Sequence, residues 1–247
     1  MVELGKHVMN LLFPPTCPGC GMFVAQNGTI CSNCWSKLSF IIKPYCPVMG
    51  TPFSYDPGEG ILSGEALASP PPFKRARSAV VHFGLARSLV TRLKYGDRID
   101  LAGSMAGWMI IAGKELIDSA DMIVPIPLHM RRFLKRTYNQ ATELSRHIAK
   151  RTGKPMQPCV IKRIRYTRQQ VGLLAKERQR NVLNAFLVPE KEQSKIRDKR
   201  ILLVDDVFTT GATVRSATKA LLKAGAADVD ILTFSRVLPD IYEEPSP

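Results

Sequence analysis

The 247-residue chain lacks a long uninterrupted apolar run, and this absence bears on its location. The longest strongly apolar stretch, at residues 105–113, is too short to cross a bilayer as a helix. The amino-terminal segment has an interrupted apolar stretch and no small-residue cleavage site after it, so it does not fit a secretory signal. We therefore expect a cytoplasmic protein without membrane insertion.

Low-complexity tracts, internal repeats and paired histidines are also missing. A hydrophobic content of 45% is normal for a globular chain and argues against wholesale disorder. His82, His129 and His147 have no partner visible in sequence, so no general base is evident. Residues 107–115 approach a phosphate-loop motif, but the glycine spacing is one residue too long and no Ser or Thr follows Lys114, which favours a core helix.

Acidic residues are scarce relative to basic ones, with 21 Asp and Glu against 35 Lys and Arg and a formal net charge of +14. This charge attracts polyanions, although a solvated basic surface explains it equally well. Three basic runs, at residues 131–136, 162–168 and 195–200, have aromatic residues nearby: Phe133, Tyr138 and Tyr166. Such a combination is typical of single-strand nucleic-acid binding. The first two runs also suit a pyrophosphate ligand, and the third also suits a solvated turn.

Four of the six cysteines form two Cys-x-x-Cys pairs, Cys17 with Cys20 and Cys31 with Cys34. Two thiolates in a tight turn bind one ion, and four sulfur ligands complete a tetrahedron around zinc. A closed site has no open coordination position, so we expect a structural Zn²⁺ that supplies most of the folding free energy of a small module. Disulfides or a redox pair are the weaker alternatives in a reducing compartment.

The two remaining cysteines stand outside this pattern. Cys46 has Met49 at the position where a partner would complete a third pair, so we predict that Cys46 is free. The alternative is that it displaces one of the four zinc ligands. Cys159 is predicted to be a buried apolar residue.

Strand and helix patterns alternate after a Gly-, Pro- and Ser-rich stretch. Strands are predicted at residues 78–83, 120–127, 159–164, 199–207 and 229–237, and helices at 84–97, 99–117, 137–153, 173–186 and 211–226. This alternation predicts an α/β fold with a mainly parallel sheet and helices on both faces. We expect a zinc-binding module at 1–50, a linker at 51–75, an α/β domain at 76–240 and a tail at 241–247.

The stretch ILLVDDVFTTGAT, at residues 201–213, predicts a ligand site. Ligands of open α/β sheets bind at the carboxyl ends of the strands. A loop that opens a helix there presents backbone N–H groups, with the positive end of the helix dipole behind them. Hydroxyls add donors and glycine lets the backbone approach, so this loop suits a monophosphate: Thr209, Thr210, Gly211, Ala212 and Thr213.

Asp205 and Asp206 precede that loop and would repel a phosphate, but acids accept hydrogen bonds from the vicinal hydroxyls of ribose. The stretch therefore predicts a phosphorylated ribose, with acids at the sugar and the loop at its 5′-phosphate. Neighbouring strand residues face opposite ways, so both acids reach the sugar only if the chain leaves the strand at about Asp206. The alternative is an acid pair that caps the next helix.

This stretch resembles the phosphoribosyl-pyrophosphate signature of the type I phosphoribosyltransferases. Together with the two Cys-x-x-Cys pairs, the stretches LKYGD, VPIPLHMRR, RTYNQATEL and TRQQVGLLAKERQRNVLNAF resemble the ComF family of competence proteins. The resemblance extends to about Val237 and covers almost the whole chain. It implies a sheet of the type I phosphoribosyltransferase kind at residues 76–240 and catalytic roles for Asp205 and Asp206.

The resemblance also implies further substrate-binding residues. The loop after the VPIP strand grips pyrophosphate in this superfamily, with arginine forks that suit phosphate oxygens: Leu128, His129, Arg131 and Arg132. The family's R-G-F/Y-N-Q stretch corresponds to Arg136, Thr137, Tyr138, Asn139 and Gln140, with Thr137 at the usual glycine. A mobile flap in relatives corresponds to the segment with Thr167, Gln170, Arg178 and Asn181, for which a solvated polar helix is the alternative. The resemblance further implies a Mg²⁺ ion that in relatives bridges pyrophosphate and ribose hydroxyls.

Three functions are compatible with these residues. The first is a phosphoribosyltransferase-like protein that binds phosphoribosyl pyrophosphate with Mg²⁺ and acts in natural competence and DNA processing. The second is a non-catalytic single-stranded DNA-binding accessory, working with a competence helicase, in which the sugar-phosphate site is a sensor. The third is a metabolic nucleobase or amine phosphoribosyltransferase. No residues specify the pocket of an acceptor.

Overall fold

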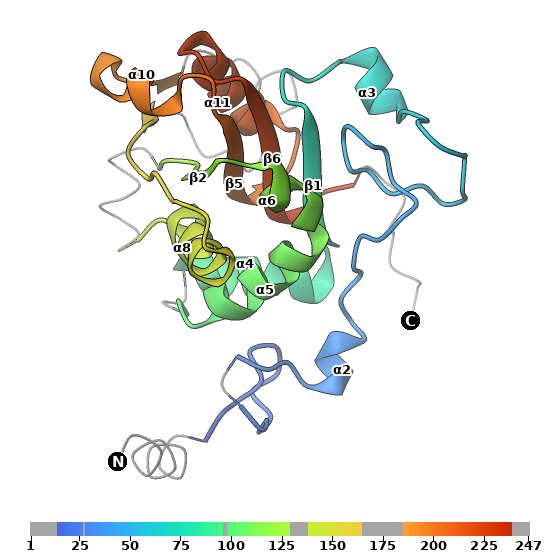
Figure 1. Ribbon diagram of the computed structural model, residues 1–247. Coiled ribbons are helices and arrows are strands. Elements are labelled where there is room, and N and C mark those ends of the chain that lie inside the picture. Colours follow the sequence, from blue (N-terminus) through green and yellow to red (C-terminus); the bar gives the residue numbers. More distant parts are fainter. Residues whose placement is uncertain (1–13, 27, 96–97, 129–137, 165–184, 239–247) are drawn as a thin grey trace.

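A computed structural model describes residues 14–26, 28–95, 98–128, 138–164 and 185–238 of the chain. At its centre lies a four-stranded sheet with the order β1-β6-β5-β2 (Figure 1). The strands are β1 (Arg75–Val81), β2 (Met122–Pro125), β5 (Arg200–Phe208) and β6 (Asp228–Arg236). All three pairings are parallel, so the predicted α/β fold with a mainly parallel sheet is confirmed.

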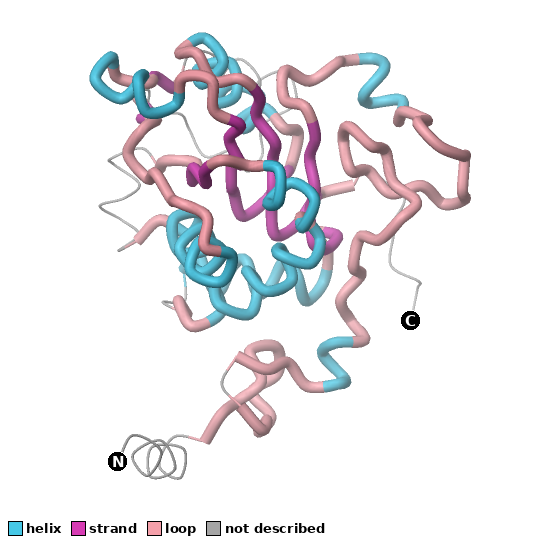
Figure 2. The backbone as a smooth tube through the Cα atoms, viewed as in Figure 1, coloured by secondary structure: helices cyan, strands magenta, loops and turns pink. Residues whose placement is uncertain are grey.

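Helices cover both faces of this sheet, and the alternation of residues along β5 explains how (Figures 1 and 2). Leu202 and Val204 pack in a core with α4 (Gly84–Tyr95), α5 (Leu101–Ala112) and α8 (Gln140–Thr152). Ile201 and Leu203 pack in a second core with α11 (Ala212–Lys223). Successive strand residues point to opposite faces, and both faces are apolar here. The predicted burial of this strand on both sides is thus confirmed.

The helices predicted at 84–97, 137–153 and 211–226 are present as α4, α8 and α11, with small shifts at their ends. The single helix expected at 99–117 is divided at Gly113 into α5 and α6 (Lys114–Ser119). A Cβ at Gly113 would lie 2.6 Å from Leu232 Cδ1, so only glycine lets this bend approach the sheet. Helix α8 ends at Gly153 in a left-handed conformation, as its sequence predicts.

Three predictions differ from the structure. The strand predicted at 159–164 is present only as β3 (Lys162–Arg163), which pairs antiparallel with β4 (Phe186–Leu187) and does not join the parallel sheet. The helix predicted at 173–186 does not include Phe186, because buried Phe186 and exposed Leu187 alternate as strand residues do; residues 173–184 lie outside the described part. Cys159 is exposed because it lies in a surface turn before β3. Helix α10 (Glu190–Ile196) was not predicted.

The amino-terminal residues, which include α2 (Ser32–Trp35) and α3 (Gly64–Ala68), reach the sheet at its β1 edge. Ile41 N–H donates to Ala79 O at 3.0 Å, and Val81 N–H donates to Ser39 O at 2.8 Å. These bonds cover an edge strand that would otherwise expose unpaired backbone groups. The division of the chain at residues 50 and 75 stays a prediction.

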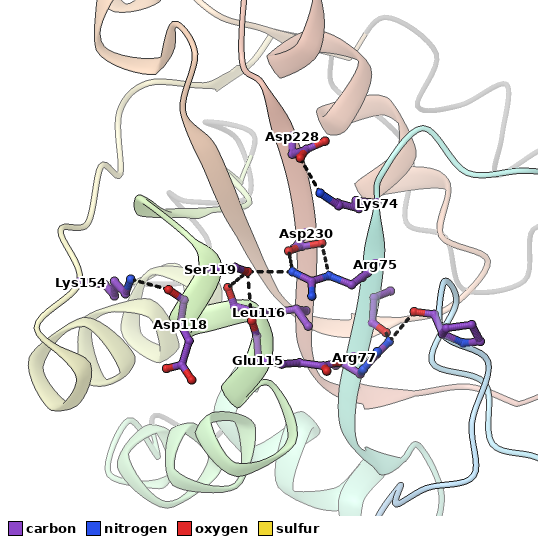
Figure 3. A network of polar contacts seen from close by, with 12 residues as sticks. Lys74, Arg75, Arg77, Glu115, Leu116, Asp118, Ser119, Lys154, Asp228 and Asp230 are labelled. Carbon is purple, nitrogen blue, oxygen red and sulfur yellow. Dashed lines mark hydrogen bonds and ion pairs between the residues drawn. The ribbon is translucent and has the colours of Figure 1, made fainter. Parts of the chain in front are cut away.

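Charged pairs close the amino end of the sheet (Figure 3). Arg75 of β1 binds both carboxylate oxygens of Asp230 of β6, at 3.1 and 2.5 Å. The same guanidinium donates to Ser119 Oγ of α6 at 2.8 Å, and Lys74 pairs with Asp228 at 2.8 Å. This network ties two strands and a helix together. Among the helices that the structure describes, none combines the length and apolar character needed to span a membrane.

Candidate sugar-phosphate site and zinc module

The candidate site lies at the carboxyl edge of the sheet, where β2 and β5 end side by side. Pro125 stands opposite Val204, and Ile126 N–H extends the pairing by donating to Val204 O at 2.8 Å. The chain after β2, which begins the predicted pyrophosphate loop at Leu128, therefore leaves from the same edge as the loop after β5. Parallel pairing thus brings two of the predicted ligand segments together.

Asp205 and Asp206 both lie within β5, which continues to Phe208. The sequence made contact of both acids with one sugar conditional on the chain leaving the strand at about Asp206; the ladder with β6 instead continues to Phe208, opposite Arg236. Asp206 points to α4, where it pairs with Lys94. Strict alternation of faces does not continue through the acid pair, because Val207 packs with the core that contains Val204, whereas Phe208 packs with the core that contains Leu203.

A lysine that the sequence analysis assigned no role contacts this pair. Lys94 Nζ of α4 lies 3.0 Å from Asp206 Oδ2, and both side chains are largely buried. Lys94 belongs to the LKYGD stretch, so the only signal in sequence was that stretch's resemblance to the family. Its contact with Asp206 arises because α4 packs on the face of the sheet to which Asp206 points.

The pKa of Asp205 is raised to about 7. Burial is the main cause, and the negative charge of Asp206 adds to it; the backbone N–H of Asp206, 2.9 Å from Asp205 Oδ1, and the charges of Lys94 and Arg163 act in the opposite direction. This carboxyl therefore changes its charge near neutral pH, whereas an ordinary aspartate is fully ionised there. A carboxyl kept in this state is typical of a functional site.

His82 lies close to the same charges, although the sequence showed no partner for it. Its Nδ1 is 2.8 Å from Ser235 Oγ, at the end of β6. Burial and the nearby Lys94 lower the pKa of His82 to about 4, so the imidazole is neutral at pH 7. Ser235 also was not predicted, because only the pairing of β1 with β6 brings it to His82.

The loop between β5 and α11 has the shape that the sequence predicts. Gly211 is the N-cap of α11 with φ +71°, and a Cβ there would lie 2.7 Å from the Phe208 ring. Glycine is thus required both by the left-handed backbone and by the ring beneath it. The start of α11 has no side-chain cap. The backbone N–H groups of its first turn, at Ala212 and Thr213, therefore lie at this edge of the sheet without a capping side chain in front of them.

Thr210 adds an unusual feature to the loop. Within the described residues, its Oγ1 is buried and has no hydrogen-bond partner. An unsatisfied buried hydroxyl costs about 1–3 kcal/mol, so such groups are rare unless a ligand completes them. Thr209, which precedes it, is partly exposed at the same turn. The hydroxyls and the start of α11 lie together in the loop for which the sequence predicts phosphate binding.

The residues of the R-T-Y-N-Q stretch that the structure describes make contacts within the protein. Tyr138 Oη donates to Leu93 O, at the end of α4. Asn139 caps α8 by accepting from Ala141 N–H at 3.1 Å, and its Nδ2 donates to Ile126 O at 2.9 Å. Gln140 is buried. These side chains join the ends of α4 and β2 to the start of α8, beside the site.

The remaining predicted ligand residues lie outside the described part of the chain. They are His129, Arg131, Arg132 and Arg136 of the pyrophosphate segment and Thr167, Gln170, Arg178 and Asn181 of the flap segment. Of the three basic runs, only residues 195–200 are fully described. Lys195 pairs with Glu192 at 2.7 Å and Arg200 with Asp121 at 3.3 Å, so this run is neutralised in part by neighbouring acids.

The four cysteines predicted to hold zinc are brought together. The Sγ atoms of Cys17, Cys20, Cys31 and Cys34 all lie within 4.8 Å of one another, with 3.6 Å between those of Cys20 and Cys31. Zn–S bonds of 2.3 Å in a tetrahedron place sulfur atoms about 3.8 Å apart, so the cluster fits the ion. The four sulfurs leave no position for substrate, and the zinc module is therefore structural.

Cys46 lies apart from this cluster and is fully buried. Its Sγ accepts hydrogen bonds from Met49 N–H at 3.4 Å and Ser63 N–H at 3.3 Å. The prediction that Cys46 is free is confirmed, and it does not displace a member of the four-cysteine cluster.

Comparison with known families agrees with both parts of the molecule. The fold and the acid-and-threonine edge define a phosphoribosyltransferase-domain protein: residues 121–240 match the phosphoribosyl transferase domain, and residues 8–66 match the double zinc ribbon domain. Over 234 residues the chain is 31% identical to the DNA utilization protein YhgH of Salmonella typhimurium, covering 92% of this chain and all of that one. The chain belongs to the family of competence protein F and the DNA utilization proteins.

Two other relatives carry competence names. Competence protein F of Haemophilus influenzae is 29% identical over 87% of this chain and 93% of its own length. Competence protein ComFC of Bacillus subtilis is 26% identical over 84% of each chain.

Solved structures give weaker likenesses. A glutamine phosphoribosylpyrophosphate amidotransferase from B. subtilis has a TM-score of 0.37 and 19% identity over 57% of this chain and 30% of its own. An orotate phosphoribosyltransferase from Aeropyrum pernix has a TM-score of 0.33 and 15% identity over 57% of this chain and 73% of its own. The assignment of the fold therefore rests on the sheet order and the family match.

Proposed function

We propose that this protein binds phosphoribosyl pyrophosphate together with Mg²⁺ at the carboxyl edge of its sheet. The observation that carries this proposal is the pairing, at the end of one strand, of two acids with a glycine-bent loop whose Thr210 hydroxyl is buried and lacks a partner within the described residues. The loop and helix start suit the 5′-phosphate, since both supply N–H and O–H donors. The acids suit ribose hydroxyls, which donate.

The charges of the site support a ligand that carries both hydroxyls and phosphates. Asp205 and Asp206 offer hard oxygen ligands of the kind that Mg²⁺ prefers, and these two residues would hold the ion. When bound, Mg²⁺ would neutralise charge between pyrophosphate and sugar. Lys94 pairs with Asp206 at 3.0 Å, and we propose that the same ammonium contacts the anionic ligand.

The contacts of Tyr138 and Asn139 support a positioning role for these residues rather than direct ligand contact. Each ties the segment before α8 to the backbone of a neighbouring element. They would thereby hold the segment that follows β2 and that carries His129, Arg131, Arg132 and Arg136. We propose that this segment grips pyrophosphate, as the family resemblance implies, and that Gln170 and Arg178 cover the ligand.

Turnover is the second part of the proposal. In phosphoribosyl transfer the bond between sugar C1 and pyrophosphate breaks, the leaving oxygen takes the electron pair, and a nucleophile forms a bond to the positively charged C1. This chain would position the donor and stabilise that charge through Asp205 and Asp206. The acceptor is not defined by any described residue; for a metabolic phosphoribosyltransferase it would be a nucleobase or an amine.

Isothermal titration calorimetry of the full chain tests the binding proposal. We expect heat for phosphoribosyl pyrophosphate with Mg²⁺, weaker heat without the ion, and weaker heat for ribose 5-phosphate or pyrophosphate alone. No heat for the complete ligand with Mg²⁺ would end the proposal. An assay of pyrophosphate release with a panel of bases and amines tests turnover separately. If no member of the panel causes release, the site would act as a sensor of the ligand.

A role in handling DNA during competence is supported by the names of the relatives and by the net charge of +14. We place this role in the cytoplasm, with single-stranded DNA and a helicase as partners. Electrostatic binding loses affinity with salt, with a slope of about 0.7 per neutralised phosphate for single strands. Fluorescence anisotropy with labelled oligonucleotides at several salt concentrations should show this slope; a flat response would exclude direct DNA binding.

A further inference from the structure

The backbone hydrogen bonds around the first Cys-x-x-Cys pair, Cys17 and Cys20, recur 29 residues later in the chain, although the sequence predicted no internal repeat. Cys17 N–H donates to Met22 O at 2.6 Å, and Cys46 N–H donates to Thr51 O at 2.8 Å. Two more hydrogen bonds follow the same offset: Gly21 to Cys17 (2.9 Å) with Gly50 to Cys46 (2.8 Å), and Val24 to Pro15 (2.9 Å) with Phe53 to Pro44 (3.0 Å). The isolated bridge of Thr16 with Phe23 likewise recurs as that of Tyr45 with Pro52.

We call the four-cysteine module, residues 15–36, the first ribbon. Its second half is repeated as well. Cys31 is the N-cap of α2, with φ −70° and ψ 160°, and Ser63 is the N-cap of α3, with φ −67° and ψ 153°. Cys31 N–H donates to Cys17 Sγ at 3.3 Å, and Ser63 N–H donates to Cys46 Sγ at the same distance. In each case the same hydrogen bond, to the sulfur of the first cysteine, joins the two halves.

This correspondence assigns a counterpart to each zinc ligand of the first ribbon. Cys17 corresponds to Cys46, Cys20 to Met49, Cys31 to Ser63 and Cys34 to Ala66. Only one thiol remains in the second set. The sequence shares Pro-x-Cys-Pro-x-x-Gly at residues 15–21 and 44–50, which is the only sign of the repeat that the residues themselves give.

The second set does not fit zinc. Ala66 offers no ligand atom, and a neutral thioether such as that of Met49 is not among the usual zinc ligands. The Ser63 hydroxyl is used within the chain, since it accepts from Ala66 N–H at 3.4 Å. We infer that residues 44–68 form a second ribbon that holds no zinc and is maintained by apolar packing and by arginines of the phosphoribosyltransferase domain.

Apolar packing fills the place of the ion. Cys46 and Met49 are fully buried, Ala66 is 4% exposed, and all three belong to the core that also contains Phe73 and β-strand residues. In the first ribbon, by contrast, Cys20 is exposed and none of its four cysteines belongs to either core. The first ribbon therefore depends on its metal, whereas the second depends on the main core of the protein.

Arginines bind the two ribbons at corresponding positions, the carbonyl of the proline that follows the first cysteine. Arg92 of α4 donates to Pro18 O at 2.6 Å. Arg77 of β1, which is labelled in Figure 3, donates to the corresponding Pro47 O at 3.0 Å. A second arginine binds the second ribbon: buried Arg236 of β6 donates to Met49 O at 2.6 Å and pairs with Glu65 at 2.7 Å. Arg236 also lies 4.3 Å from the Phe208 ring, beneath the Gly211 loop.

Metal analysis of the purified full chain, by inductively coupled plasma mass spectrometry after dialysis, tests this inference. We expect about one zinc per chain, since the described residues contain one four-cysteine cluster. About two zinc ions per chain would overturn the inference. The Cys46→Ser variant should keep its zinc, because Cys46 is not a ligand; loss of zinc from this variant would also overturn it.

A triple variant provides the positive test. Met49→Cys, Ser63→Cys and Ala66→Cys together restore four thiols at the corresponding positions, and we expect the zinc content to double. The matched control, Cys20→Met with Cys31→Ser and Cys34→Ala, should bring it close to zero. A folded triple variant with unchanged zinc content would show that the positions do not correspond.

Hydrogen exchange of the wild-type chain separates the two ribbons without any substitution. After a chelator removes zinc, amides of residues 15–36 should exchange faster, while those of residues 44–53 keep their protection. Equal loss of protection in both segments would contradict a metal-free second ribbon.

Discussion

The two ends of the central sheet differ in how they treat charged side chains. At the amino end, Asp230, Asp228 and Asp121 each pair with a lysine or arginine. At the carboxyl end, Asp205 has a pKa raised to about 7, and the buried Thr210 hydroxyl has no partner within the described residues. Gly211 is held there in a left-handed conformation against an aromatic ring.

This difference separates an end that stabilises the fold from the end at which we propose that the ligand binds. The amino end satisfies its charges, so it contributes to the stability of the fold. The carboxyl end retains a repelling acid pair and an unsatisfied hydroxyl, which cost free energy in the ligand-free protein. Such features persist where a ligand supplies the missing partners, and exchanging side chains at the two ends gives matched tests.

The largest contrast is expected from Asp205→Asn and Asp230→Asn. Asp205→Asn should weaken phosphoribosyl pyrophosphate binding by roughly 10- to 100-fold, because a hydrogen bond to a charged group is worth about 1.5–3 kcal/mol. Asp230→Asn should leave binding unchanged but lower the free energy of unfolding by about 2 kcal/mol, because it breaks the Arg75 pair. Calorimetry and denaturant unfolding measure the two effects. Equal loss of affinity in both variants would refute the division of roles.

Two glycines with the same backbone conformation give the next test. Gly211 has φ 71° and ψ 1°, and Gly153 has φ 72° and ψ 1°, but only a Cβ at Gly211 meets Phe208. Alanine at either position should cost about 1–2 kcal/mol of stability through the left-handed backbone. Gly211→Ala should in addition lower ligand affinity by about tenfold or more, because the loop must shift away from the ring. If Gly153→Ala weakens binding as much, the loop geometry is not the cause.

The raised pKa of Asp205 predicts opposite pH trends for stability and binding. The folded protein keeps this proton up to about pH 7, whereas the unfolded chain releases it near 3.8. The resulting contribution to stability is complete below the unfolded pKa and is lost as pH rises through about 7. Affinity for the Mg²⁺ complex should rise over the same range, since the ion prefers the carboxylate, by up to about tenfold per pH unit below 7. Calorimetry between pH 6 and 8 measures this trend, and Asp205→Asn should remove it.

The smallest effect is expected from two buried threonines. Thr210 and Thr218 both have a buried hydroxyl without a partner among the described residues, but only Thr210 lies in the loop. Replacing either by valine should leave stability unchanged or raise it by up to about 1 kcal/mol. Thr210→Val should weaken ligand binding by roughly 5- to 10-fold, and Thr218→Val should not. Thermal shift and calorimetry distinguish these outcomes, and unchanged binding by Thr210→Val would remove its hydroxyl from the site.

Local patterns predicted much of this molecule because they depend on neighbours in the chain. The two Cys-x-x-Cys pairs, the buried β5 and the loop at Gly211 all follow from spacing, periodicity and glycine geometry. Lys94 could not be assigned in this way, because its contact with Asp206 crosses more than a hundred residues of chain and depends on where α4 packs. The strand predicted at 199–207, by contrast, agrees with β5 to within one residue at each end.

The amino-acid sequence by itself determined which groups are available: four thiolates in two tight turns, a strand that is apolar on both faces, and an acid pair before a hydroxyl-rich loop. Tertiary structure decided their surroundings. It placed Lys94 beside Asp206, raised the pKa of Asp205 through burial, and set Met49 and Ala66 where a second metal would otherwise lie. Burial and long-range pairing are properties of the packed chain, and no local window of residues contains them.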